Sequence, residues 1–141
     1  YNHSVKNHER NFRISIILLF IIGIVFGVYE ELNPYVFPSQ IALYLDEIDY
    51  LPDTTLDNVH FVVIILLYIC LYFFVPYSNY VLLAYIIIFY LIQIFISDDN
   101  TLAIYSPLFQ NMLYFIYMLF GVQIYLMFFT SLSEKFNIKK K

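Results

Sequence analysis

Three histidines, His3, His8 and His60, are the side chains of this chain best suited to haem or metal chemistry. A haem held inside a membrane by two histidines needs them on facing helices, and only His60 lies beside a long apolar segment. His60 is therefore one candidate ligand for haem or metal. A hydrogen bond from an interfacial imidazole to a loop carbonyl is the simpler interpretation, and we favour it. Cys70 is the only cysteine, which excludes a disulfide framework and a thiolate metal site.

Other patterns that support catalysis are missing from the sequence. There is no glycine-rich phosphate loop, and no nucleophile has a nearby base. The centres of the apolar segments contain no Asp, Glu, Lys, Arg or His, the residues that mark proton and ion paths inside membranes. The basic residues lie only near the two ends of the chain, which argues against a nucleic-acid partner. We therefore assign no catalytic residue, cofactor ligand or metal ligand, and we expect no enzyme activity from the chain by itself.

A few polar side chains do lie within the apolar segments, namely Ser15, Gln93, Gln110, Asn111 and Gln123. Amides inside a membrane can join helices through hydrogen bonds of roughly 0.6 to 2 kcal/mol each. Beside tyrosines they can also hold a quinone head group. We favour the first role, contacts between helices.

The composition indicates a membrane protein. Hydrophobic residues make up 62% of the 141 residues and charged residues only 13%, whereas soluble domains carry about 25% charged residues. A chain this short has too much surface to hide so many apolar side chains from water. Lipid and other membrane subunits are therefore the expected surroundings.

Four apolar segments predict an all-α membrane protein with four transmembrane helices in a single domain, residues 1–141. The segments are Ile14–Tyr29, Val59–Val75, Tyr80–Ile96 and Leu108–Leu132. A helix needs roughly 17 to 25 residues to cross a membrane, and the first segment gains length if Phe12 and Arg13 lie at the interface. Pro76–Asn79 separates the middle two segments and predicts a helical hairpin.

The distribution of charge supports an even number of crossings. With four helices, all seven Lys and Arg residues fall on the side of the two termini, and nine of the eleven Asp and Glu residues fall on the other. Basic residues beside membrane helices mark the cytoplasm-like side, which in a mitochondrion is the matrix. We therefore expect both termini on the matrix-like side.

Residues 30–58 form an acidic loop on the opposite side, with seven acidic residues and no Lys or Arg. Within the loop, Ile41, Leu45 and Ile48 recur at helical spacing, and Ser39 is the expected N-cap. This pattern predicts a short amphipathic helix at the interface, between Pro38 and Pro52. Its acidic face could dock a basic partner, but a solvated face that follows topology rules is the simpler interpretation.

The first apolar segment carries a G-x-x-x-G motif, Gly23 to Gly27. Two glycines at this spacing let the backbones of two membrane helices approach closely. The motif predicts tight packing against a neighbouring helix, either of this chain or of another subunit.

The residue usage also bears on the origin of the chain. Phe and Tyr number 15 each, whereas Gly numbers only three, a bias typical of AT-rich genomes such as those of mitochondria. In composition, length and helix count the chain resembles the divergent hydrophobic subunits encoded in ciliate-like mitochondrial genomes. The resemblance implies a subunit of a respiratory complex or of the ATP synthase in the mitochondrial inner membrane. We favour a non-catalytic subunit of complex IV or complex I, with other subunits and lipids as partners. A small bacterial scaffold or transporter protein is an alternative.

A more local likeness lies in residues 33–41, NPYVFPSQI. This stretch resembles the segment after the fifth helix of cytochrome b, where an Asn-Pro and a later Pro precede a Pro-Glu-Trp-Tyr motif. The resemblance implies, as an alternative function, a divergent fragment of a quinone-binding redox subunit. The chain contains no Pro-Glu-Trp-Tyr motif and no Trp, so no site residue is carried over.

Overall fold

The computed structural model describes residues 2–33, 35–36, 38–47, 54–96 and 106–137. These residues form helices joined by turns and contain no β-strand. The elements are α1 (Asn2–Leu32), α2 (Ser39–Glu47), α3 (Thr54–Tyr72), α4 (Ser78–Ile96), α5 (Pro107–Phe129) and a 3-10 helix, η1 (Ser131–Phe136). The predicted all-α class is confirmed for this part of the chain.

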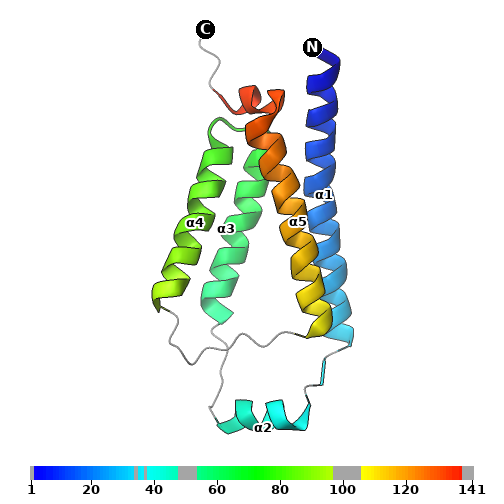
Figure 1. Cartoon of the computed structure of the whole chain (residues 1–141), viewed down its shortest axis with the longest axis vertical. Coiled ribbons are helices and arrows are strands. Elements are labelled where there is room, and N and C mark those ends of the chain that lie inside the picture. The colour runs from blue at the N-terminus through cyan, green and yellow to red at the C-terminus, as the bar shows by residue number, and fades with distance from the viewer. Residues whose placement is uncertain (1, 34, 37, 48–53, 97–105, 138–141) are drawn as a thin grey trace.

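The four long helices run along the long axis of the molecule, and α2 lies across one end of it (Figure 1). Helix α1 packs beside α5, and α3 packs beside α4. The start of α1, the α3–α4 turn and η1 meet at the end opposite α2, which we call the terminal end. The end that carries α2 is called the loop end.

Three helices are long and apolar enough to cross a membrane: His3–Leu32, Ser78–Phe95 and Pro107–Phe129. Helix α3 contributes a shorter apolar stretch, Asn58–Tyr72. The buried residues within the best window of each long span amount to only 17%, 22% and 17% of the window. Most of the apolar surface of these helices therefore faces outward, as expected of a membrane protein.

Helix α1 is longer than the predicted segment, because it begins at Asn2 rather than at Ile14. The added turns contain no Gly or Pro, and an ion pair between Glu9 and Arg13, four residues apart, supports the helix there. The helix ends at Leu32, since Asn33 precedes Pro34 and a residue before proline disfavours helical geometry. The backbone N–H of Asn33 donates to the carbonyl of Tyr29 at 3.0 Å and closes the last turn.

The α3–α4 connection is the predicted helical hairpin, with the turn shifted toward α3. Helix α3 ends at Tyr72 and α4 begins at Ser78. Phe74 and Tyr77 adopt φ angles of 52° and 63°, in the left-handed region that costs about 1–2 kcal/mol for a residue with a side chain. Backbone hydrogen bonds hold the turn, and one of them runs from the N–H of Tyr77 to the carbonyl of Phe136 at 2.8 Å.

The ends of α5 are set by side-chain caps. Ser106 accepts a hydrogen bond from the N–H of Phe109 at 3.1 Å, and Pro107 occupies the first helical position. At the other end, Thr130 adopts an extended conformation and its hydroxyl accepts from the N–H of Leu132 at 3.2 Å. The predicted final helix, Leu108–Leu132, is therefore broken at Thr130, and η1 turns back toward α1.

The predicted amphipathic helix of the acidic loop is α2, although its cap differs from the prediction. The carbonyl of Pro38 accepts from the N–H groups of Ile41 and Ala42, so Ser39 is the first helical residue rather than the N-cap. Asp46 and Glu47 are exposed. Ile48, and with it the end of the predicted apolar stripe, lies outside the described residues.

The buried core lies mainly at the terminal end. Phe12 and Phe136 are both 0% exposed, and their rings meet edge to face with centroids 5.9 Å apart. The other buried apolar residues are Ile16, Tyr68, Leu71, Leu82, Leu126, Met127 and Leu132. They come from the start of α1, the end of α3, the start of α4, the end of α5 and η1. One compact cluster thus holds all four long helices together at this end.

Candidate functional site

A cavity of about 470 Å³ lies between the four long helices. Five of its nine lining residues carry rings: His60, Tyr68, Tyr90, Tyr117 and Phe120. The others are aliphatic and come from α1, α3, α4 and α5: Leu19, Ile64, Ile86 and Ile116. The volume falls within the range of small-molecule sites, about 300–1,000 Å³, and the wall combines apolar surface with a few polar groups as such sites do.

His60 lies in the cavity wall near the loop end. Its Nδ1 is 2.9 Å from the hydroxyl of Tyr85, and its ring stacks on Phe89 with centroids 3.8 Å apart and planes at 17°. The partner of Nδ1 is thus a tyrosine of α4. The contact joins α3 to α4 and fixes the imidazole in the wall.

Tyr68 and Gln123 form a buried pair between α3 and α5. The hydroxyl of Tyr68 donates to Oε1 of Gln123 at 2.7 Å, and the two residues are 4% and 0% exposed. The interhelical role predicted for the amides is confirmed at Gln123. Within the described residues, Nε2 of Gln123 is buried without a hydrogen-bond partner, an arrangement that costs about 1–3 kcal/mol.

Two other polar residues of the apolar segments, Ser15 and Gln110, behave differently. The hydroxyl of Ser15 donates to the carbonyl of Phe12 at 2.7 Å, and Nε2 of Gln110 donates to the hydroxyl of Tyr114 at 3.3 Å. Both bonds lie within a single helix. Neither bond joins two helices of this chain, because each side chain finds its acceptor one turn away along its own helix.

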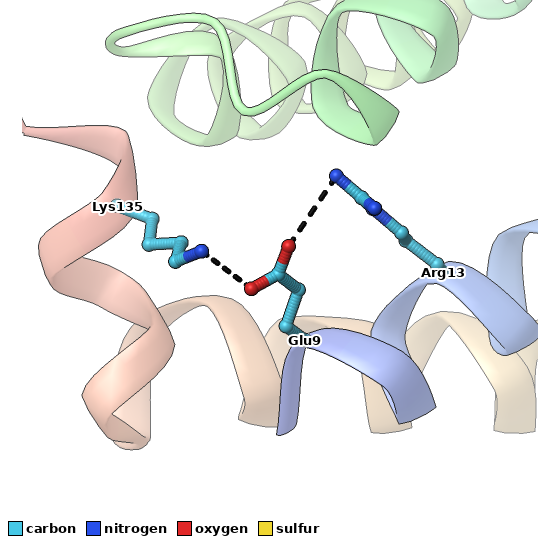
Figure 2. Close-up of polar contacts among 3 residues, drawn as sticks. All are labelled: Glu9, Arg13 and Lys135. Carbon is cyan, nitrogen blue, oxygen red and sulfur yellow. Dashed lines mark hydrogen bonds and ion pairs between the residues drawn. The ribbon is translucent and has the colours of Figure 1, made fainter. Parts of the chain in front are cut away.

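A charged cluster ties α1 to η1 at the terminal end (Figure 2). Glu9 binds Arg13 through Oε1 at 3.3 Å and Lys135 through Oε2. The guanidinium of Arg13 also lies 5.1 Å from the ring centroids of both Tyr72 and Phe74. Since the three charged side chains are 21–39% exposed, each ion pair contributes at most about 1 kcal/mol. The cluster therefore connects α1 to η1 and is not a reactive site.

A second polar link joins α1 to α5 at the loop end. The hydroxyl of Ser106 donates to Oε1 of Glu30 at 3.0 Å. The carboxylate of Glu30 thereby lies beside the first turn of α5, where the helix dipole favours a negative charge. Polar contacts thus hold α1 to α5 at the loop end and to η1 at the terminal end.

The remaining sequence candidates do not form a reactive site. Among the residues that the structure describes, no three His, Cys, Asp or Glu side chains gather as a metal site requires. His8 lies 3.4 Å from the hydroxyl of Ser131, and Cys70 is half-buried in α3. The sequence singled out His60 and Gln123 but missed Tyr68, which connects Gln123 to the cavity.

Comparisons of the chain with protein-family models, with curated proteins and with solved structures find no match, so its function is inferred from its residues and their geometry.

Proposed function

We propose that the chain is a non-catalytic, structural transmembrane subunit of a mitochondrial respiratory-chain complex, with complex IV or complex I favoured. The observation that carries the proposal is the small buried share of the long apolar helices. The core joins the helices mainly at the terminal end, and long stretches of apolar surface face outward. Such surface can pack against the helices of larger subunits and hold lipid. The AT-biased composition and the absence of ionisable groups at the helix centres support the same role.

The subunit would cross the membrane four times. Helix α3 is about 28 Å long and its apolar stretch, Asn58–Tyr72, covers about 22 Å of this, a length that a locally thinned bilayer accommodates. The start of α1, the α3–α4 turn and η1 lie together at the terminal end (Figure 1), an arrangement that fits an even number of crossings. All seven basic residues would then face the matrix, and α2 would lie at the intermembrane-space surface.

Purification in mild detergent tests the proposed role. A tagged chain is expected to co-migrate with a large assembly that has respiratory activity. Loss of the chain should reduce the amount of intact assembly, while the turnover of the assembly that remains should be unchanged. A chain that migrates alone, or a normal amount of assembly without it, would refute the proposal.

Cysteine labelling tests the topology. In a Cys70→Ala background, Ser4→Cys at the start of α1 and Ala42→Cys on α2 each introduce one exposed thiol. In intact mitoplasts, a membrane-impermeant maleimide is expected to label the Ala42→Cys variant at once and the Ser4→Cys variant only after permeabilisation. Labelling of both variants from the same side would contradict the four-crossing arrangement.

The G-x-x-x-G face of α1 is the expected contact with another subunit. Gly23 and Gly27 are exposed, and a Cβ atom at either position would meet nothing within 4 Å. No described helix of this chain covers the face, which supports a contact with a helix of another subunit.

Gly27→Leu should therefore weaken assembly with the neighbouring subunit and leave unfolding of the isolated chain unaffected or slightly stabilised, since leucine favours helix by up to about 1 kcal/mol. Gly121→Leu is the matched control, because Gly121 also has open space around it but lacks a second glycine four residues away. Native electrophoresis of the assembly measures the difference. Equal effects of the two substitutions would count against a glycine-mediated contact.

A further inference from the structure

We infer that the outward face of α1 binds an anionic phospholipid in the leaflet at the terminal end. Lys6 and Arg10 hold the lipid phosphate, and the apolar residues that continue the same face contact its acyl chains. The inference rests on the proposed crossing of the membrane by α1, and it names the kind of lipid that the subunit would hold. It does not depend on which assembly the subunit joins.

One continuous face of α1 changes from basic to apolar along the helix. Lys6, Arg10 and Arg13 follow one another at intervals of four and three residues, so they share this face. Four aliphatic residues, each 45–65% exposed, continue it at the same intervals: Ile17, Ile21, Ile24 and Val28. A molecule that covers the whole face must therefore carry a negative charge at one end and hydrocarbon along the rest.

The positive charge on this face is not compensated by the described part of the chain. Lys6 and Arg10 are exposed and form no ion pair with a described residue. Glu9, the acidic residue closest to them in sequence, binds Arg13 with one carboxylate oxygen and Lys135 with the other. Both oxygens of this carboxylate are thus engaged by other cations, and the two exposed cations remain available to a ligand.

Arg10 lies at the level of the lipid phosphates. Ile14 begins the apolar part of α1, and Arg10 precedes it by four residues, or about 6 Å along the helix. The polar layer of a bilayer extends about 5–8 Å beyond the hydrocarbon on each side. Lys6 lies one turn farther out. Since side chains four residues apart are neighbours on a helix, both can reach one phosphate.

The charge of the face selects an anionic lipid. The guanidinium of Arg10 can donate two parallel hydrogen bonds to phosphate oxygens, and the flexible side chain of Lys6 adds a second positive charge. In phosphatidylcholine the choline cation offsets the phosphate, whereas in phosphatidylglycerol no cation does. A sterol carries no charge, and a soluble acidic loop would leave the aliphatic part of the face uncovered.

The proposed contact with another subunit leaves this face open. That contact uses Gly23 and Gly27, and Ile24 and Val28 are the residues that follow them in sequence. Successive residues are about 100° apart around a helix. The glycine face and the lipid-binding face are therefore neighbouring but distinct sides of α1.

Quenching of tryptophan fluorescence by brominated lipids tests the inference in the purified full chain. The chain contains no Trp, so Ile17→Trp places a single reporter on the face. The membrane is phosphatidylcholine with a minor fraction of phosphatidylglycerol that is brominated on its acyl chains. This lipid should quench the reporter more strongly than the same fraction of brominated phosphatidylcholine, with a preference of about three- to tenfold.

Val81→Trp is the matched control reporter. Val81 is 51% exposed and lies in the first turn of α4, also at the terminal end, and α4 contains no Lys or Arg. This reporter should show no preference for the anionic lipid. An equal preference at both reporters would overturn the inference, because the positive charge of the whole end, and not this face of α1, would then attract the lipid.

Substitution of the two cations gives the second measurement. Lys6→Gln combined with Arg10→Gln should abolish the preference at Ile17→Trp, whereas Lys6→Arg combined with Arg10→Lys keeps the charge and should retain it. A preference that survives the glutamine substitutions, or none in the unsubstituted chain, would refute lipid binding by these residues. If inorganic phosphate removes the preference and potassium chloride of equal ionic strength does not, the two residues bind free phosphate and the lipid assignment is wrong. None of these outcomes bears on assembly, which the co-migration experiment measures separately.

Discussion

Phe136→Ala should destabilise the chain by about 3–5 kcal/mol, the usual cost of deleting a fully buried phenylalanine ring. Phe136 is 0% exposed and packs against Phe12 and Phe74, with ring centroids 5.9 and 5.3 Å away. It comes from η1, so its loss opens a cavity in the cluster that joins η1 to α1 and the α3–α4 turn. Denaturant unfolding in detergent micelles, followed by circular dichroism, measures the change in free energy.

Phe129→Ala is the matched control for this experiment. Phe129 is the last residue of α5, is 73% exposed and lies only seven positions from Phe136. Its truncation should change the unfolding free energy by less than about 0.5 kcal/mol. If the two substitutions had similar effects, the buried cluster at the terminal end would not be what stabilises the bundle.

Glu9→Lys should destabilise the terminal end by about 1–2 kcal/mol at low ionic strength. The substitution removes two ion pairs, each of at most about 1 kcal/mol at these exposures, and places a third cation beside Arg13 and Lys135. The penalty should shrink in concentrated salt, because salt screens charges that are open to solvent. Thermal unfolding in detergent at two salt concentrations measures both effects.

Two further variants separate the loss of attraction from the new repulsion. Glu9→Gln removes the pairs without adding a charge, so it should cost less than Glu9→Lys. The double substitution Glu9→Lys with Lys135→Glu restores one opposite pair and should recover part of the stability. A double variant as unstable as Glu9→Lys alone would show that Glu9 and Lys135 do not interact in solution.

The helices of this fold could be predicted from the sequence, and their pairing could not. Long apolar runs and the sorting of charge indicated the four helical segments and placed the two termini at one end. The partners of each helix were hidden because the helices are apolar over nearly their whole circumference, so no stripe of residues marks a packed face. Phe136 and Phe129 have the same side chain and close positions, yet one is buried and the other exposed. The helix breaks at Thr130, whose side chain caps η1, so Phe129 ends α5 and Phe136 lies in η1.

The candidate site was predictable only in part, for a similar reason. His60 and Gln123 stand out because histidines and amides are rare in apolar segments. Tyr68 is one of 15 tyrosines, and nothing in its neighbourhood along the sequence distinguishes it. The left-handed residues Phe74 and Tyr77 were also missed, since neither is a residue that usually adopts positive φ. Contacts distant in sequence, such as Tyr77 with Phe136, fix their conformation.

The pairing of the first helix with the last sets an order for biogenesis. Helices α3 and α4 are joined by a five-residue turn and can form a hairpin as soon as both have left the ribosome. Helix α1 packs mainly with α5 and η1, which are synthesised after α3 and α4. Until α5 is made, α1 therefore lacks the helix against which it packs most. A chain that stalls before α5 would leave α1 without this cover, and the contact between Glu9 and Lys135 can form only after η1 is made.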